Sequence, residues 1–185
     1  DEGTVTVTNE AGPFAVTSQD TEATFTAGEA ETITWDVANT NLLPIASETV
    51  DIFLSVDGGI TFPNLIAQNV VNDGSHAVVI PGGFSTDSGR FMIKASDNIF
   101  FAVNTTNFSI EESEVVLNFD DLNYEICKPN DLVVNFNYET YLDFTEQSML
   151  SVATLPLGLT AVFSQDTVSV SNTPIDITFS GTENL

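Results

Sequence analysis

The stretch of sequence that decides the fold is residues 48–63, ETVDIFLSVDGGITFP. In its first half Val50, Ile52 and Leu54 occupy every second position, which is the period-two pattern of a β-strand with two distinct faces. The residues that follow, Asp57-Gly58-Gly59, tolerate the positive φ angles that a tight turn between two strands requires. The stretch therefore predicts a β-hairpin, and it indicates a kind of module more clearly than an activity.

The turn of this hairpin carries a recognisable motif. Ser55-x-Asp57-x-Gly59-x-Thr61-Phe62 resembles an Asp-box, S-x-D-x-G-x-T-W, with Phe62 in place of the tryptophan. An aspartate side chain can accept backbone N–H bonds inside a turn while glycine takes the strained backbone position, and the aromatic residue is expected to pack beneath. The motif can be a folding device or a ligand or ion site. We favour the folding device, because short motifs often mislead about function.

Similar short strands are predicted along the rest of the chain. Residues 32–37 alternate, with Ile33, Trp35 and Val37 on one face. Trp35, the only tryptophan, is expected in a sandwich core rather than on the surface as a carbohydrate-stacking residue. Turn signals recur at short intervals and no helical period is present. This pattern predicts an all-β fold made of β-sandwiches.

The order of strands and turns predicts two tandem Ig/fibronectin-III-like β-sandwiches. Residues 1–11 are expected to be a lead-in strand or linker, with a short extended run at residues 4–8. Residues 12–111 are expected to form the first sandwich, which contains the Asp-box-like hairpin and a polar loop at residues 85–89. Residues 112–185 are expected to form the second, with one of its strands at residues 148–153.

The second sandwich is expected to be incomplete or to be completed from elsewhere. We count about six strands in it, and the final hairpin of a seven-stranded sandwich is missing. Either the fragment ends early or the missing strands come from another segment. An open sheet edge at this place would invite pairing with another chain.

The chain is strongly acidic, with 27 acidic and 3 basic residues in 185 and a formal net charge of −24. This balance argues against nucleic acid and anionic membranes as partners, because phosphate binding needs Lys and Arg. The hydrophobic content of 42% is too high for a disordered acidic tail. Solubility and self-repulsion are the favoured interpretation of the charge, and divalent cation binding is the alternative.

The sequence shows no targeting or membrane segment. No apolar run is long enough to span a bilayer, so no membrane insertion is predicted. No signal peptide opens the chain, so the numbering is expected to start inside a longer precursor. Cys127 is the only cysteine, and it is expected to be a buried, inert thiol rather than half of a bridge to another segment.

The chain offers little catalytic chemistry. His76 is the only histidine, the zincin motif H-E-x-x-H is missing, and a zinc site usually needs several His or Cys ligands. No G-x-S-x-G surrounds a serine, and a Cys127–His76 pair would join two different predicted units. So many acidic residues make any glycosidase-like carboxylate pair uninformative. We therefore assign no catalytic, cofactor-binding or metal-ligating residue.

Calcium is the one cofactor that the sequence leaves open. The acidic turns supply oxygen ligands of the right type, at Asp57, Asp73, Asp87 and Asp120-Asp121. No EF-hand loop is present, and acidic residues in turns more often cap backbone N–H groups. Asn104 and Asn107 both lie in N-x-[ST] patterns, which we interpret as chance matches.

Several stretches together resemble a known module. They are residues 12–18 (GPFAVTS), 32–40 (TITWDVANT), 50–59 (VDIFLSVDGG) and 98–101 (NIFF). They look like a module found after the catalytic domain in secreted bacterial zinc metalloproteases of the reprolysin-like type, over roughly residues 12–111. Residues 126–129 (ICKP) and 155–161 (LPLGLTA) are similar to the Ig-like repeat that follows that module.

The resemblance implies a non-catalytic accessory region of a secreted protease whose zinc-binding residues lie in another domain. Its expected partners are the catalytic domain of the same precursor and a protein or polysaccharide substrate, and its expected location is extracellular. The expected role is spacing, docking or surface binding. The alternative is an adhesin or carbohydrate-binding module, which would need a row of exposed, coplanar aromatic residues. Tyr124, Tyr138 and Tyr141 are its nearest candidates.

Overall fold

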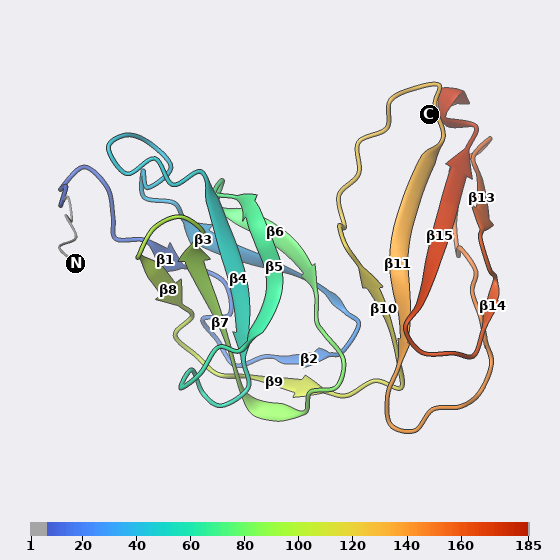
Figure 1. Ribbon diagram of the computed structural model, residues 1–185, viewed down its shortest axis with the longest axis horizontal. Helices are drawn as coiled ribbons and strands as arrows, with labels where there is room; N and C mark the ends of the chain where they lie inside the picture. Colours follow the sequence, from blue (N-terminus) through green and yellow to red (C-terminus); the bar gives the residue numbers. More distant parts are fainter. Residues whose placement is uncertain (1–6, 185) are drawn as a thin grey trace, which may run out of the picture. The chain divides into compact units, whose positions relative to one another are not determined.

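The computed structural model describes residues 7–184 of the chain. The fold is all-β, and its strands form several sheets (Figure 1). Contacts divide the chain into two compact units. The first comprises Asp1–Phe25, Glu31–Val78 and Ser85–Glu111, and the second comprises Thr26–Ala30, Val79–Phe84 and Glu112–Leu185. In the part of the chain that the structure describes, no helix is long and apolar enough to cross a membrane.

The regular elements have the following bounds: β1 (Ala15–Val16), β2 (Thr24–Thr26), β3 (Ala30–Asp36), β4 (Thr49–Ser55), β5 (Asn64–Val71), β6 (Ser75–Val79), β7 (Thr86–Ala95), β8 (Phe101–Val103), β9 (Phe108–Glu111), β10 (Val115–Phe119), β11 (Leu132–Thr140), β12 (Ser148–Met149), β13 (Thr160–Phe163), β14 (Thr167–Val168), β15 (Thr173–Ser180) and the short 3-10 helix η1 (Thr182–Asn184).

Two sheets build the first unit. The larger has the order β2-β9-β7-β4-β5, with β8 also paired to β7, and the smaller has the order β1-β3-β6. Strands β4 and β7 are antiparallel, and their register places Val50, Ile52 and Leu54 opposite Ala95, Ile93 and Phe91. All six side chains are buried, so the period-two pattern of β4 forms the core face of the sheet. The hairpin between β4 and β5 is present.

Trp35 on β3 is a core residue, as its strand pattern predicts. Only 4% of its surface is exposed, and its indole Nε1 donates to Asn72 Oδ1 at 2.8 Å. The Asn72 amide donates in turn to Thr40 Oγ1 and to the Ser47 carbonyl. A buried polar group needs such partners, and these join the tryptophan to the loop that precedes β4.

The prediction of a polar loop at residues 85–89 is wrong, because strand β7 begins at Thr86. Thr86 lies opposite Ile110 and Gly89 opposite Phe108 on β9, with a register shift between these pairs. The residues are polar or small, so the sequence lacks the apolar alternation of a strand. Pairing with β9 gives this segment its strand structure despite its weak local preference.

The second unit is built on an antiparallel sheet of order β10-β11-β15-β13. One face of this sheet carries the core residues Phe136 and Tyr138 of β11 and Ile175 and Ile177 of β15. A short two-stranded sheet, β12-β14, contributes Val168 to the same core. The two layers give the sandwich arrangement, but the second layer is much the smaller.

Two details of the second unit, and one of the start of the chain, bear on the expectations from sequence. The predicted strand at residues 148–153 is paired only at Ser148 and Met149. The contacts group Thr26–Ala30 and Val79–Phe84 with the second unit, where Ala27 and Val79 pack with Val116. The extended run expected at residues 4–8 lies mostly outside the described residues.

Candidate functional site

The Asp-box-like turn has the geometry that its motif predicts. Ser55 Oγ donates to Asp57 Oδ1 at 2.6 Å and accepts the Gly59 N–H at 2.9 Å. The Asp57 carboxylate also accepts the N–H groups of Ile60 and Thr61 at 3.0 Å and the Thr61 hydroxyl at 2.6 Å. These contacts all lie within the hairpin, which is the arrangement expected of a folding device.

The same contacts set the acidity of Asp57. Hydrogen bonds from the Ser55 and Thr61 side chains, with those from the backbone of Thr61 and Ile60, hold the pKa of the Asp57 carboxyl well below its usual range. The carboxylate therefore stays charged at neutral pH, and both of its oxygens already accept hydrogen bonds. A cation at this turn would have to compete with them.

The other acidic turns are also engaged with neighbouring groups. Asp73 accepts the Ser75 N–H, Asp87 accepts the Ser109 hydroxyl, and Asp121 accepts the Asn123 N–H. Among residues 7–184, no three His, Cys, Asp or Glu side chains cluster as metal ligands would. The first unit has a polar hollow of about 480 Å³, and the acidic residues that line it are Glu22 and Asp87.

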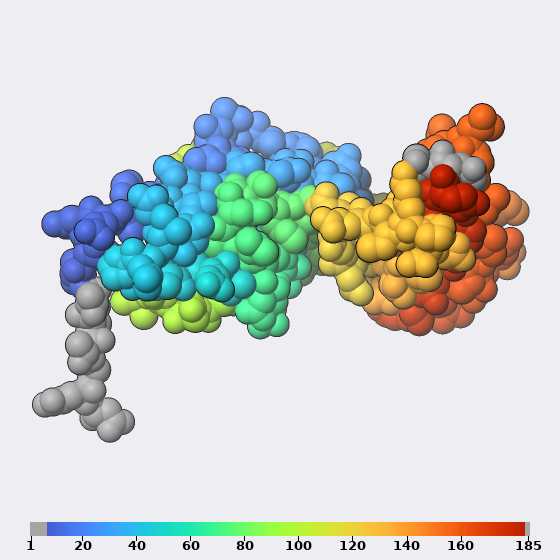
Figure 2. Space-filling model, turned by 90° about the horizontal axis from the view of Figure 1, so that it is seen from above, coloured from blue at the N-terminus to red at the C-terminus, as the bar shows by residue number. Residues whose placement is uncertain are grey.

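His76 and Cys127 lie in different units, on β6 and in the loop after β10 respectively. His76 is half-buried. The prediction of a buried Cys127 is wrong, because its side chain is exposed. Free cysteines are often buried, but Cys127 opens a turn in which the Asn130 N–H donates to its carbonyl. The segment around it is gold at the surface in Figure 2.

The two N-x-[ST] asparagines take part in internal hydrogen bonds. Asn104 is 1% exposed; its Oδ1 accepts the Phe91 N–H and its Nδ2 donates to the Gln19 carbonyl. Asn107 Oδ1 accepts from Arg90 Nε at 2.5 Å. The amide nitrogen of Asn104 is thus occupied inside the folded unit, where a glycan has no room.

The three tyrosines do not form an exposed row. Tyr138 is fully buried, and its hydroxyl pairs with Ser148 Oγ at 2.8 Å. Tyr141 is half-buried and donates to Glu139 Oε2 at 2.6 Å. Burial and then the contact with Glu139 raise the pKa of Tyr141 to about 12. Tyr124 is exposed, and it lines a cleft of the second unit.

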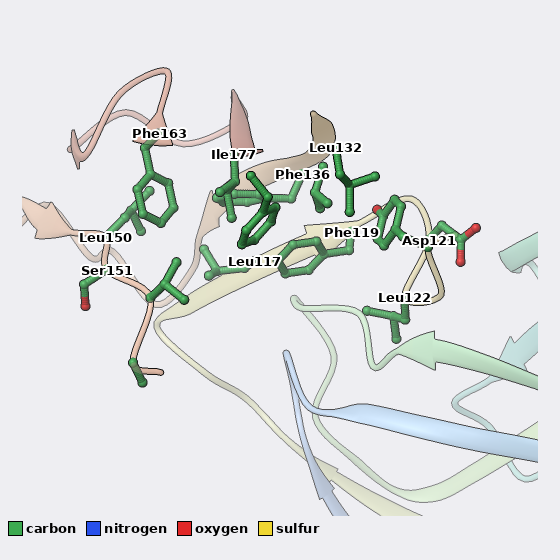
Figure 3. Close-up of a pocket in the computed structure, with 15 residues that line it drawn as sticks. Leu117, Phe119, Asp121, Leu122, Leu132, Phe136, Leu150, Ser151, Phe163 and Ile177 are labelled. Atoms are coloured by element: carbon green, nitrogen blue, oxygen red, sulfur yellow. The ribbon is translucent and has the colours of Figure 1, made fainter. Parts of the chain in front are cut away.

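This cleft of the second unit has a volume of about 500 Å³. Its floor is the core face of the four-stranded sheet, with Leu117 and Phe119 of β10, Phe136 of β11 and Phe163 of β13. Figure 3 shows Leu150 and Ser151 on one side of the cleft and Asp121 and Leu122 on the other. The lining is mostly apolar.

The cleft exists because the second layer covers only part of the sheet. Val168 packs on Tyr138 and Ile175, which are fully buried. The aromatic side chains of Phe119, Phe163 and Phe179 pack at the margin of the core and are only half-buried. Phe119 and Phe136 have ring centroids 4.8 Å apart. A complete sandwich would cover these rings with a facing strand.

The sequence did not single out this cleft. The alternation of Leu117 with Phe119, and of Val134 with Phe136, predicts a core face, and the strand count suggests an incomplete sandwich. Neither signal says which part of the face stays open. That depends on where the β12 ladder stops and on the loop at residues 120–131, which are features of the folded chain.

Comparison with known proteins adds no family to this description. No protein-family model matches the chain. A search of curated proteins also finds no match. The resemblance to modules of reprolysin-like proteases therefore stays a prediction from the sequence.

Proposed function

We propose that the chain is a non-catalytic accessory region of a secreted bacterial protease, and that its second unit docks a polypeptide in the apolar cleft. The two units are proposed to be of the immunoglobulin or fibronectin III type. The cleft is the observation that carries the docking role. The resemblance of residues 12–111 to protease-associated modules supports the accessory role.

The chemistry of the cleft supports docking. Binding sites are typically concave, mostly apolar and marked by a few polar groups. Here half-buried apolar side chains meet Asp121 and Ser151 at the sides of the cleft. An apolar surface that stays open in an acidic, charged chain indicates a contact with another molecule. The partner would be a segment of the precursor's catalytic domain or of a protein substrate.

The alternative, an adhesin or carbohydrate-binding module, has less support. It needs coplanar exposed aromatic rings, and the burial of Tyr138 removes the middle member of the proposed row. Trp35 is buried as well. Of the three tyrosines Tyr124 alone is exposed, and it borders the apolar cleft. A polypeptide partner fits this lining better than a polysaccharide does, because sugar hydroxyls need polar groups.

The test uses Nile red, a neutral dye that fluoresces in apolar surroundings. The dye should bind the wild-type chain and bind the variant Ala153→Trp much less, because residue 153 is exposed at the cleft and a tryptophan there would fill it. Ile60→Trp is the matched control, since Ile60 is 83% exposed in the other unit.

A polypeptide should then displace the dye. We expect reduced and alkylated lysozyme, which is unfolded and basic, to displace Nile red from the wild-type chain. Native lysozyme, with the same sequence in a folded state, should not. Equal dye binding by wild type and Ala153→Trp, or no displacement by the unfolded polypeptide, would refute docking in the cleft.

A further inference from the structure

One side of the cleft is formed by a strand whose pairing stops early. Ser148 and Met149 pair with Val168 and Thr167 of β14. In residues 7–184, β12 has no other sheet partner. The strand alternation nevertheless continues: the Ser148 hydroxyl bonds Tyr138 inside, Met149 is 83% exposed, and Leu150 packs on the core. Residues 148–152 thus form one edge of this short sheet, and residues 150–152, which follow β12, line the cleft.

The backbone of this edge has hydrogen-bonding groups that point away from β14. The Leu150 N–H donates to the Asp166 carbonyl of the β14 side at 2.7 Å. Backbone groups of successive residues in a strand point in opposite directions, so those of Met149 and Ser151 point to the open side. An exposed row of this kind is a template for another strand.

The loop that forms the opposite side of the cleft is acidic. Residues 120–131 contain Asp120, Asp121, Glu125 and Asp131 and a single basic residue, Lys128. Burial, followed by the charges of Asp121 and Asp120, raises the pKa of Tyr124 in this loop. The negative field at this side of the cleft favours a partner that carries Lys or Arg.

Building on the docking function above, we propose that the cleft binds an extended strand from a separate polypeptide, with alternating apolar residues and basic flanks. The strand pairs with the free edge of Met149 and Ser151 and directs its apolar side chains onto Phe119, Phe136 and Phe163. Strand addition to an exposed edge is a known mode of peptide recognition, in which main-chain bonds give affinity and alternate side chains give specificity.

Geometry favours this edge over the other free edges of the unit. A strand lies about 4.8 Å from its neighbour in the hydrogen-bonding direction, and facing sheets lie about 10 Å apart. A strand next to β12 therefore stands over the cleft, opposite the sheet that forms its floor. A strand added at β10 or β13 would only widen that floor. A second copy of the chain is disfavoured as the donor, because each copy carries a net charge of −24.

The test uses the peptide Lys-Lys-Ile-Thr-Ile-Thr-Ile-Thr-Lys-Lys in the Nile red displacement assay. A second peptide has the same side chains but N-methyl groups at alternate backbone positions on its pairing edge. A third has glutamates in place of the lysines. We expect the first peptide to displace the dye and the other two to bind at least tenfold more weakly, as judged by the midpoint of displacement.

Protein variants locate the contact. Ser151→Pro removes the outward N–H and should weaken binding of the first peptide tenfold or more. Ser151→Ala keeps that N–H and should bind this peptide as the wild type does. The Nile red affinity of each variant is measured first and used to correct its displacement midpoint, and the circular dichroism spectrum, which should match that of the wild type, controls for folding.

The possible outcomes separate the two proposals. Equal displacement by the N-methylated peptide would overturn strand addition but leave docking in the cleft intact. Equal displacement by the acidic peptide would overturn the proposed preference for a partner with basic flanks. Displacement by unfolded lysozyme but by none of the peptides would also overturn the proposal that the partner binds as a strand. A chain that dimerises through the cleft, with dimers lost in Ser151→Pro, would assign the edge to a second copy and overturn the basic partner.

Discussion

Asp57 shows how one side chain can organise a turn. Its carboxylate accepts hydrogen bonds from Ser55, Ile60 and Thr61. Asp57→Asn keeps the size of the side chain but removes its charge and replaces one acceptor oxygen with a donor. We expect a lower urea midpoint for this variant at pH 7. Asp73→Asn is the control, because Asp73 accepts one N–H, from Ser75. Loss of this single hydrogen bond should lower the urea midpoint less.

The effect of Asp57→Asn should depend on pH. The folded-state pKa of Asp57 is lowered, and an unfolded aspartate titrates near pH 3.9. The stabilisation by the charged carboxylate is therefore complete above about pH 4 and is lost as the pH falls below it. The difference between the urea midpoints of wild type and variant should stay constant from pH 7 to about pH 5 and narrow as the pH falls toward 3. A constant difference over this range would contradict the role of the charge.

At Gly89 the neighbouring side chain leaves no room for a Cβ atom, so only glycine fits. A Cβ added to Gly89 would lie 2.3 Å from Phe108 Cε2. The Phe108 ring cannot easily move, because it is buried against Phe91 and Phe25 at centroid distances of 4.7 and 5.2 Å. Gly89→Ala should therefore cost about 1–3 kcal/mol of unfolding free energy through overpacking, measured by urea denaturation.

A control for Gly89→Ala is available in the same unit. A Cβ at Gly58 would meet nothing within 4 Å, but Gly58 has a φ of +80°. Gly58→Ala thus tests backbone strain without overpacking, and we expect a cost of about 1 kcal/mol or somewhat more. If Gly89→Ala were no more destabilising than Gly58→Ala, the ring of Phe108 would have to be mobile.

At the level of elements, Asn72 connects strand β3 to the loop that leads into β4. Its side chain bonds Trp35, Thr40 and Ser47 at once. Asn72→Ala leaves the buried indole N–H of Trp35 without its partner, which should cost about 1–3 kcal/mol. Hydrogen exchange should accelerate in residues 40–47, which lose two contacts.

Asn64 provides the comparison for this prediction. It is half-buried, and its Nδ2 donates to the Leu54 carbonyl at 3.1 Å. Asn64→Ala should cost less than Asn72→Ala and should leave the exchange rates of residues 40–47 unchanged. Equal exchange in the two variants would show that the Asn72 network does not hold the loop.

The strands differ in how well the sequence predicts them. The alternation in β4 and β11 reports a face that is buried in the fold, so local pattern and tertiary structure agree. At residues 86–89 the strand depends on pairing with β9, and the local sequence pattern does not predict this pairing. At residues 150–153 the pattern of a strand is present but the ladder stops, since pairing needs a neighbour. The cleft combines side chains from four strands and two loops, so the sequence predicts its apolar floor but not its opening.

On the scale of the whole molecule, the charge of −24 should weaken the folded state through self-repulsion. Salt screens such repulsion, and the Debye length falls from about 30 Å at 0.01 M to about 10 Å at 0.1 M. We expect the melting temperature to rise with NaCl over this range. A melting temperature that is independent of NaCl would mean that the acidic residues are too far apart to repel one another appreciably.

Calcium distinguishes screening from a specific site. A ligand that binds only the folded state adds about 2.7 kcal/mol at 100 times its dissociation constant. In residues 7–184 no three metal-ligating side chains cluster, and the Asp57 oxygens already accept hydrogen bonds. We therefore expect CaCl2 and MgCl2 at equal concentration to raise the melting temperature equally, since both would act through charge screening. A larger shift with CaCl2, reversed by a chelator, would instead assign a selective calcium site to acidic residues whose oxygens rearrange on binding.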